Sequence, residues 1–76
     1  MTTRNELNLV GLKCPLPIVE LNRAIKQMSP GEELQVVASD PAFPLDVEAW
    51  CRRTGQILLG LQEQDGRYHA LLRKAK

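Results

Sequence analysis

A cysteine followed by two prolines is the feature of this sequence whose residue types could do chemistry. Cys14 directly precedes Pro15, and Pro17 follows after one intervening residue, Leu16. Proline fits the first turn of a helix, where N–H groups lack intrahelical acceptors, but it does not fit a helix interior. We therefore expect Cys14 at or just before a helix N-terminus. Because residues that precede proline avoid the helical region, either Pro15 or Pro17 could be the first helical residue.

This position predicts a nucleophilic sulfur. Free N–H groups and the positive end of a helix dipole favour an anion, and Lys13 is an adjacent cation. We expect the N–H groups of Leu16 and Ile18 to point at the Cys14 thiolate and to stabilise it moderately. The alternative is that Cys14 is a small buried hydrophobic residue, as most free cysteines are. The local residues do not separate these two hypotheses.

Composition limits the other classes of function. A chain of 76 residues is long enough for one small domain, 1–76, with a modest core and no room for a large enclosed cofactor. The net charge of +1 provides no basic field for direct nucleic-acid binding. No apolar run is long enough to cross a membrane, and the first six residues contain no apolar signal segment. We expect a soluble cytoplasmic protein without a cofactor.

The cysteine and histidine content argues against a stapled or metal-bound fold. The two cysteines, Cys14 and Cys51, match no small disulfide framework. The only histidine is His69, and the chain has neither a Cys-x-x-Cys motif nor a histidine pair. A structural zinc site would therefore lack ligands, and we expect no metal.

The segments around Cys14 predict a strand, a helix and a second strand. Residues 6–10 alternate as a short strand with Leu7 and Leu9 on one face, and Gly11 marks its end. Residues 17–28 form an amphipathic helix, which the Ser-Pro-Gly sequence at 29–31 stops. Its apolar positions are Ile18, Leu21, Ile25 and Met28. Residues 33–39 form the next strand, with alternate apolar positions at Leu34, Val36 and Ala38. A parallel crossover follows from this order.

A second helix follows the turn at Asp40-Pro41, where Asp40 is a candidate helix cap. Gly55 is well placed to end this helix. The apolar stripe consists of Phe43, Val47, Trp50, Cys51 and Thr54. It places Cys51 on the buried face beside the only tryptophan, which favours a structural cysteine over a reactive one.

The C-terminal segment predicts a hairpin with a two-residue turn at Asp65-Gly66. In the matching register, Ile57, Leu59 and Leu61 share the buried face with the apolar residues of the last strand, Tyr68, Ala70 and Leu72. His69 then lies on the opposite face, across from Gln62. A lone exposed histidine is more often incidental than catalytic.

The elements together predict an α/β fold: a two-layer βαβαββ sandwich with a mixed four-stranded sheet and both helices packed on one face. The other sheet face would carry four apolar residues, Val10, Val37, Leu58 and Leu71. These could form a docking surface, or they could be ordinary strand residues.

Two motifs give the sequence a family resemblance. The first is Gly11-Leu12-Lys13-Cys14-Pro15-Leu16-Pro17, which fits a Gly-x-x-Cys-Pro-x-Pro signature, and the second comprises Ser39-Asp40-Pro41-Ala42, Asp46 and Trp50-Cys51-Arg52-Arg53-Thr54-Gly55. With both motifs, the chain resembles the TusA family of small sulfur carriers, also called SirA-like, from Leu7 to Leu72. One residue departs from the family pattern: Asn8 replaces a usual aspartate, which bears on the branch and partner that this chain serves.

The resemblance implies the same βαβαββ fold and a sulfurtransferase that works as a relay, not as a multi-turnover enzyme on small molecules. Cys14 would carry sulfur as a persulfide, with Gly11, Lys13, Pro15 and Pro17 as supporting motif residues. The donor would be a cysteine desulfurase or a rhodanese-like protein, and a downstream protein would accept the sulfur. In the best-known branch the relay ends in 2-thiouridine of tRNA, and other branches serve sulfur oxidation or molybdenum-cofactor biosynthesis. We expect a monomer, whose exposed cysteine two proteins contact in turn.

Two other classes of function remain open. The first is a non-catalytic interaction or regulatory module in which Cys14 is structural. The second is RNA binding, suggested by the likeness of the family fold to the C-terminal domain of translation initiation factor 3. Fold analogy is weak support for a function, and the near-neutral charge and three aromatic residues argue against a base-stacking surface.

Overall fold

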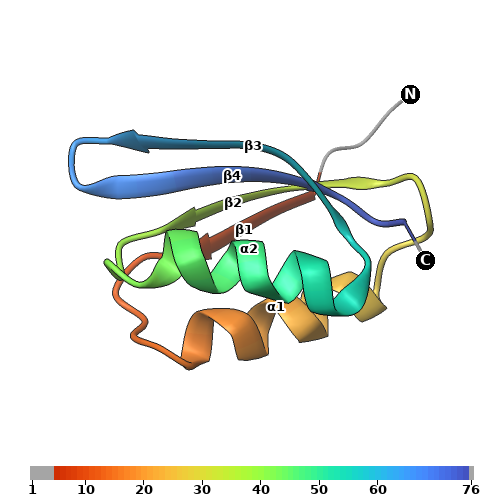
Figure 1. Ribbon diagram of the computed structural model, residues 1–76, viewed down its shortest axis with the longest axis horizontal. Helices are drawn as coiled ribbons and strands as arrows, with labels where there is room; N and C mark the ends of the chain where they lie inside the picture. Colours follow the sequence, from red (N-terminus) through yellow and green to blue (C-terminus); the bar gives the residue numbers. More distant parts are fainter. Residues whose placement is uncertain (1–4, 76) are drawn as a thin grey trace.

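The computed structural model describes residues 5–75, which form the predicted βαβαββ sequence of elements (Figure 1). These elements are β1 (Asn5–Leu9), α1 (Leu16–Lys26), β2 (Glu33–Ala38), α2 (Phe43–Thr54), β3 (Ile57–Gln64) and β4 (Arg67–Arg73). Residues 1–4, which make up most of the N-terminal segment for which no signal sequence was predicted, lie outside the described residues, as does residue 76.

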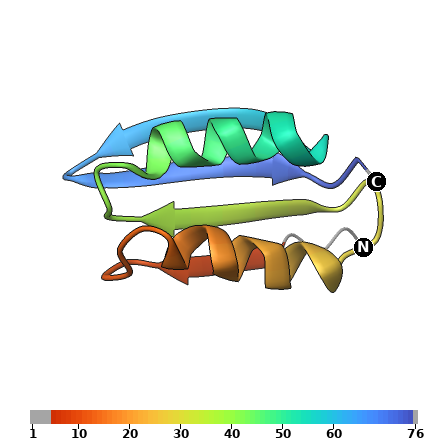
Figure 2. The same ribbon diagram turned by 60° about the horizontal axis from the view of Figure 1, so that its bottom comes forward.

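The four strands form one mixed sheet in the order β1-β2-β4-β3. Strand β1 pairs in parallel with β2, whereas β4 is antiparallel to both β2 and β3. Helices α1 and α2 lie side by side on the same face of the sheet, with their N-termini at the carboxyl ends of β1 and β2 (Figure 2). The predicted fold class is confirmed.

The core lies between the helices and the covered sheet face. Trp50 and Phe43 from α2 are fully buried, as is Leu21 from α1. They pack with the inward residues of the strands, Leu9, Leu34, Val36, Ala38, Ala70 and Leu72. The predicted stripes on both helices are confirmed at their central positions, while Ile18 and Thr54 at the ends are half-buried. Among the described residues, no charged or polar side chain is buried.

Several element boundaries differ from the sequence-based ones by one or two residues. Helix α1 begins at Leu16, between Pro15 and Pro17, the two residues that were expected to start it. It ends at Lys26 because the N–H of Gln27 bonds the carbonyl of Ala24, which is three residues back and not four. Met28 is nevertheless buried, at 7% exposure. Strand β1 ends at Leu9 because the N–H of Val10 bonds the side chain of Asn8 at 3.0 Å, which begins a turn.

The predicted hairpin turn is confirmed, but its register changes within β3. Asp65 and Gly66 both have positive φ, as a two-residue hairpin turn of type I′ requires, and the expected pairing holds from Gln64 to Gly60. A bulge at Leu59 then places Leu58 opposite Leu72. The prediction that Ile57 and Leu59 share the buried face is therefore wrong: they are 41% and 43% exposed, and Leu58 packs against the core in their place.

The apolar residues of the uncovered sheet face are only partly those that the sequence predicted. Leu58 turns inward at the bulge, and Val10 lies in the turn after β1, so Val37 and Leu71 remain of the four expected residues. His69 lies on this face and pairs with Gln62, as predicted. The face contains two shallow hollows, each of about 450 Å³ and each bordered by Gln35 and His69.

Candidate functional site

The loop that carries Cys14 is joined to the loop after β2 by two hydrogen bonds. The N–H of Gly11 donates to the Ser39 hydroxyl at 2.9 Å, and the N–H of Cys14 donates to an Asp40 carboxylate oxygen at 3.1 Å. Gly11 has a φ of 92°, a conformation that favours glycine. Because β1 and β2 are parallel, the loops at their carboxyl ends meet at one edge of the sheet. Topology therefore brings the two sequence motifs together.

The remaining motif residues shape the start of α1. Pro15 occupies the N-cap position, and its carbonyl accepts the N–H groups of Ile18 and Val19, both at 3.1 Å. Pro17 lies in the first turn and is fully buried against the core. Lys13 is exposed, and its carbonyl accepts the N–H of Leu16 at 2.8 Å. Pro15 and Pro17 thus fix the direction in which the helix leaves the Cys14 loop.

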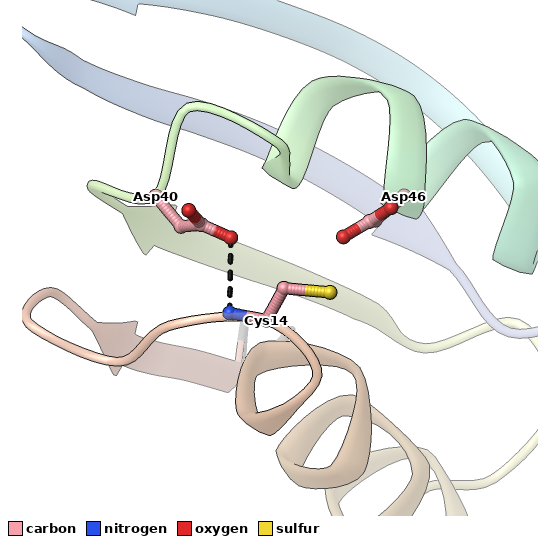
Figure 3. Close-up of side chains that lie close together, drawn as sticks. All are labelled: Cys14, Asp40 and Asp46. Carbon is pink, nitrogen blue, oxygen red and sulfur yellow. Dashed lines mark hydrogen bonds between the residues drawn. The ribbon is translucent and has the colours of Figure 1, made fainter.

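The sulfur of Cys14 is exposed and faces two carboxylates (Figure 3). Cys14 Sγ and one oxygen each from Asp40 and Asp46 lie within 4.8 Å of one another. The pKa of the Cys14 thiol is raised, first because Asp46 accepts its hydrogen bond, then through partial loss of solvent, and then through the negative charges of Asp46 and Asp40. The expectation of a stabilised thiolate is wrong.

The reason for this difference lies in the backbone donors of the first helical turn. The N–H of Leu16 bonds the Lys13 carbonyl, and the N–H of Ile18 bonds the Pro15 carbonyl. Both donors that were expected at the sulfur therefore bond carbonyl groups. Helix polarity still favours an anion here, but the nearest charged groups that face the sulfur are anions. The other hypothesis, a buried structural cysteine, is contradicted by the exposure of Cys14.

Asp40 and Asp46 are the site residues whose roles sequence reasoning missed. Asp40 was expected to cap α2, but the N-cap residue is Ala42 without a side-chain hydrogen bond, and Asp40 bonds Cys14 N–H instead. Asp46 lies in the first turn of α2 and reaches toward the sulfur across the gap between the helices (Figure 3). The available signal was the parallel pairing of the first two strands, which places the segment after each strand at one edge.

The other singled-out residues lie elsewhere. Asn8 lies on the uncovered face of β1, where its side-chain oxygen accepts the N–H of Val10, a role that an aspartate oxygen would also fill. Cys51 is buried in the C-terminal half of α2, at 6% exposure, and burial raises the pKa of its thiol. His69 lies on the uncovered sheet face.

The sequence contains no metal-binding motif, but the fold brings together possible metal ligands from separate segments. One thiol and two carboxylates come together at Cys14, and three such groups could surround a cation. Exposed acidic groups commonly gather without one, and no other feature of the described residues indicates a metal. The effect of these two carboxylates that the structure supports is the raised pKa of the Cys14 thiol.

Comparison with known proteins identifies the family. The family model described as sulfurtransferase TusA matches residues 5–74. The chain is 52% identical over 60 residues to a Neisseria meningitidis protein provisionally named a sulfur carrier, covering 79% of this chain and 81% of the relative. It is 39% identical over 70 residues to the sulfur carrier protein TusA of Allochromatium vinosum, covering 92% of both chains.

A solved structure gives the same fold. The crystal structure of a SirA-like protein from Desulfitobacterium hafniense matches with a TM-score of 0.80 at 15% identity, covering 93% of this chain and 97% of that chain. Taken with the sequence matches, the chain belongs to the TusA sulfurtransferase family. Its general role is that of a sulfur carrier. Within residues 5–75, no helix is long and apolar enough to cross a membrane.

Proposed function

We propose that Cys14 is the residue that carries sulfur, as a persulfide that it receives from one protein and passes to another. The observation that carries this proposal is the exposure of the thiol at the edge where the Cys14 loop meets the start of α2. Two proteins must reach the same sulfur in turn, which a deep pocket would prevent. The other cysteine, Cys51, is buried and therefore unsuited to this role.

Loading proceeds by thiol–disulfide chemistry that needs no cofactor. The Cys14 thiolate attacks the outer sulfur of a persulfide on the donor protein. A bond forms between Cys14 Sγ and that sulfur, the S–S bond of the donor breaks, and its electron pair returns to the donor cysteine. No oxidant is consumed. A thiolate of the acceptor protein then attacks the outer sulfur on Cys14 and releases the Cys14 thiolate.

The surface at this edge supports docking by proteins. Leu16 and Leu45, in the first turns of the two helices, are 49% and 73% exposed. Large apolar side chains at the rim of a reacting group provide contact area for a partner. We propose a cysteine desulfurase or a rhodanese-like protein as donor, a downstream sulfur-acceptor protein as recipient, and a cytoplasmic monomer as the working form. The final product would be 2-thiouridine in tRNA or the product of another sulfur pathway.

Intact-protein mass spectrometry tests the proposal. The wild type, Cys14→Ser and Cys51→Ser are each incubated with a cysteine desulfurase and cysteine. We expect the wild type and Cys51→Ser to gain the mass of one sulfur atom, reversibly with reductant, and Cys14→Ser to gain none. If no variant gains sulfur from several different donors, the proposal fails and the alternative, a non-catalytic interaction module, is favoured.

A further inference from the structure

The carboxylate of Asp46 lies close to the sulfur of Cys14. Asp46 is half-buried, and within residues 5–75 no basic side chain forms an ion pair with it. It lies in the first turn of α2. The side chain points toward Cys14 Sγ (Figure 3). A carboxylate from a second helix therefore faces the sulfur.

Asp40, the other carboxylate within 4.8 Å of the sulfur, acts differently. One of its carboxylate oxygens accepts the N–H of Cys14, so this side chain holds the backbone of the loop in place. The charged groups that face the thiol are thus Asp40 from the connection before α2 and Asp46 from α2, and the neighbouring Lys13 is exposed. Of the two carboxylates, Asp46 has the stronger effect on the thiol, through a hydrogen bond as well as through charge.

We propose that Asp46 is a positioning residue for sulfur transfer, which holds the Cys14 thiol proton in the free carrier and keeps the sulfur weakly nucleophilic until a partner docks. This inference rests on the proposed function, since it concerns the regulation of the same sulfur. The thiolate is the reactive form of cysteine, so a carboxylate that favours the thiol lowers reactivity toward all electrophiles. A docked partner that draws the carboxylate away from Sγ, or neutralises it, releases this restraint.

The experiment measures the rate of Cys14 alkylation by iodoacetamide against pH, with Cys51→Ala as the common background. We compare this parent with Asp46→Asn and with Asp46→Ser, a second variant that lacks the charge. Glu48→Gln is the matched control, because Glu48 lies on the same helix and borders Cys51, not Cys14. Circular dichroism shows whether each variant is folded.

We expect both Asp46 variants to move the midpoint of the profile to lower pH and to alkylate faster at neutral pH. For each pH unit by which the midpoint falls, the thiolate fraction at a pH below the midpoint rises about tenfold. The alkylation rate rises only about threefold, because the intrinsic nucleophilicity of a thiolate falls with its pKa. Glu48→Gln should follow the parent. If folded Asp46 variants keep the parent midpoint, or if Glu48→Gln moves it equally, the proposal is overturned.

The sulfur-loading assay on the same proteins separates this proposal from the function on which it rests. Sulfur loading on Cys14 with an unchanged alkylation profile in the Asp46 variants would overturn the role of Asp46 and leave the carrier function intact. A changed profile without loading from any donor would overturn the carrier function, and with it the role of Asp46 in transfer. Loading together with a lowered midpoint supports both.

Discussion

The indole N–H of Trp50 donates a hydrogen bond of 2.8 Å to the side-chain oxygen of Asn22, which joins α2 to α1. Trp50 is fully buried, so its polar atom needs a partner within the protein. The same two helices position the residues that face each other at the site, because Cys14 lies two residues before α1 and Asp46 lies in the first turn of α2. This bond therefore helps to hold the geometry of the site as well as the core.

Replacing Asn22 tests this connection. Asn22→Ala leaves the indole N–H without a partner, and we expect the free energy of unfolding to fall by about 1 to 2 kcal/mol. Asn22→Asp retains an oxygen acceptor and should keep most of the stability. Urea denaturation followed by tryptophan fluorescence measures both. Equal midpoints for the wild type and Asn22→Ala would show that the bond contributes little.

Lys74 caps the C-terminus of α1 from the far end of the chain. Its ammonium group donates to the carbonyl oxygens of Ile25 at 2.8 Å and Met28 at 2.6 Å. Lys74→Met keeps the aliphatic stem but removes the donors and the charge, and we expect a loss of about 1 to 2 kcal/mol. Thermal unfolding should show a Tm lower by several degrees. Lys26→Met, an exposed position on the same helix, is the control and should change the Tm much less.

The bulge in β3 predicts opposite outcomes for two adjacent leucines. Leu58 packs against the core, and Leu59 is 43% exposed. We expect Leu58→Ala to cost about 1 to 2 kcal/mol, below the usual cost for a fully buried leucine. Leu59→Ala should cost less than about 0.5 kcal/mol. Chemical denaturation of the two variants decides between this register and the regular one, in which Leu59 would be the more sensitive position.

Burial of Cys51 makes stability depend on pH. Because burial raises the pKa of this thiol in the folded state, the unfolded chain loses the proton first as pH rises. The contribution of the Cys51 thiol to the free energy of unfolding is complete below about pH 8.5 and declines above that pH. We expect the denaturation midpoint of Cys51→Ala, measured with reductant present, to fall less steeply above that pH than the wild-type midpoint. A parallel decline in both proteins would contradict this prediction.

The sequence was most informative where a local rule determines structure. The turn at Asp65-Gly66 followed from turn chemistry, and the stripe on α2 followed from helical spacing. The bulge in β3 was not predicted because Ile57, Leu58 and Leu59 are consecutive apolar residues, so alternation does not identify which of them faces inward. One extra residue in a strand reverses the faces before it, and the adjacent Gly60, a residue type that often marks a bulge, does not identify which leucine is the extra one.

The site was predictable in part for a related reason. The helix start beside Cys14 follows from its prolines, and the motif residues were identified by resemblance. The state of the thiol depends on Asp46, which comes from another helix and reaches the sulfur only through packing of α1 against α2. A prediction based on neighbours in the sequence included the cation Lys13 and omitted both carboxylates. The predicted direction of the effect on the pKa of the Cys14 thiol was therefore wrong.

The bulge at Leu59 has a consequence for solubility. Strand β3 lies at an edge of the sheet, where free N–H and C=O groups could pair with a strand of another molecule and begin aggregation. An irregular edge interrupts the even spacing that such pairing requires, and the far end of β3 carries the polar residues Gln62, Glu63 and Gln64. The feature that reversed the faces of β3 also makes this edge a poor template for self-association.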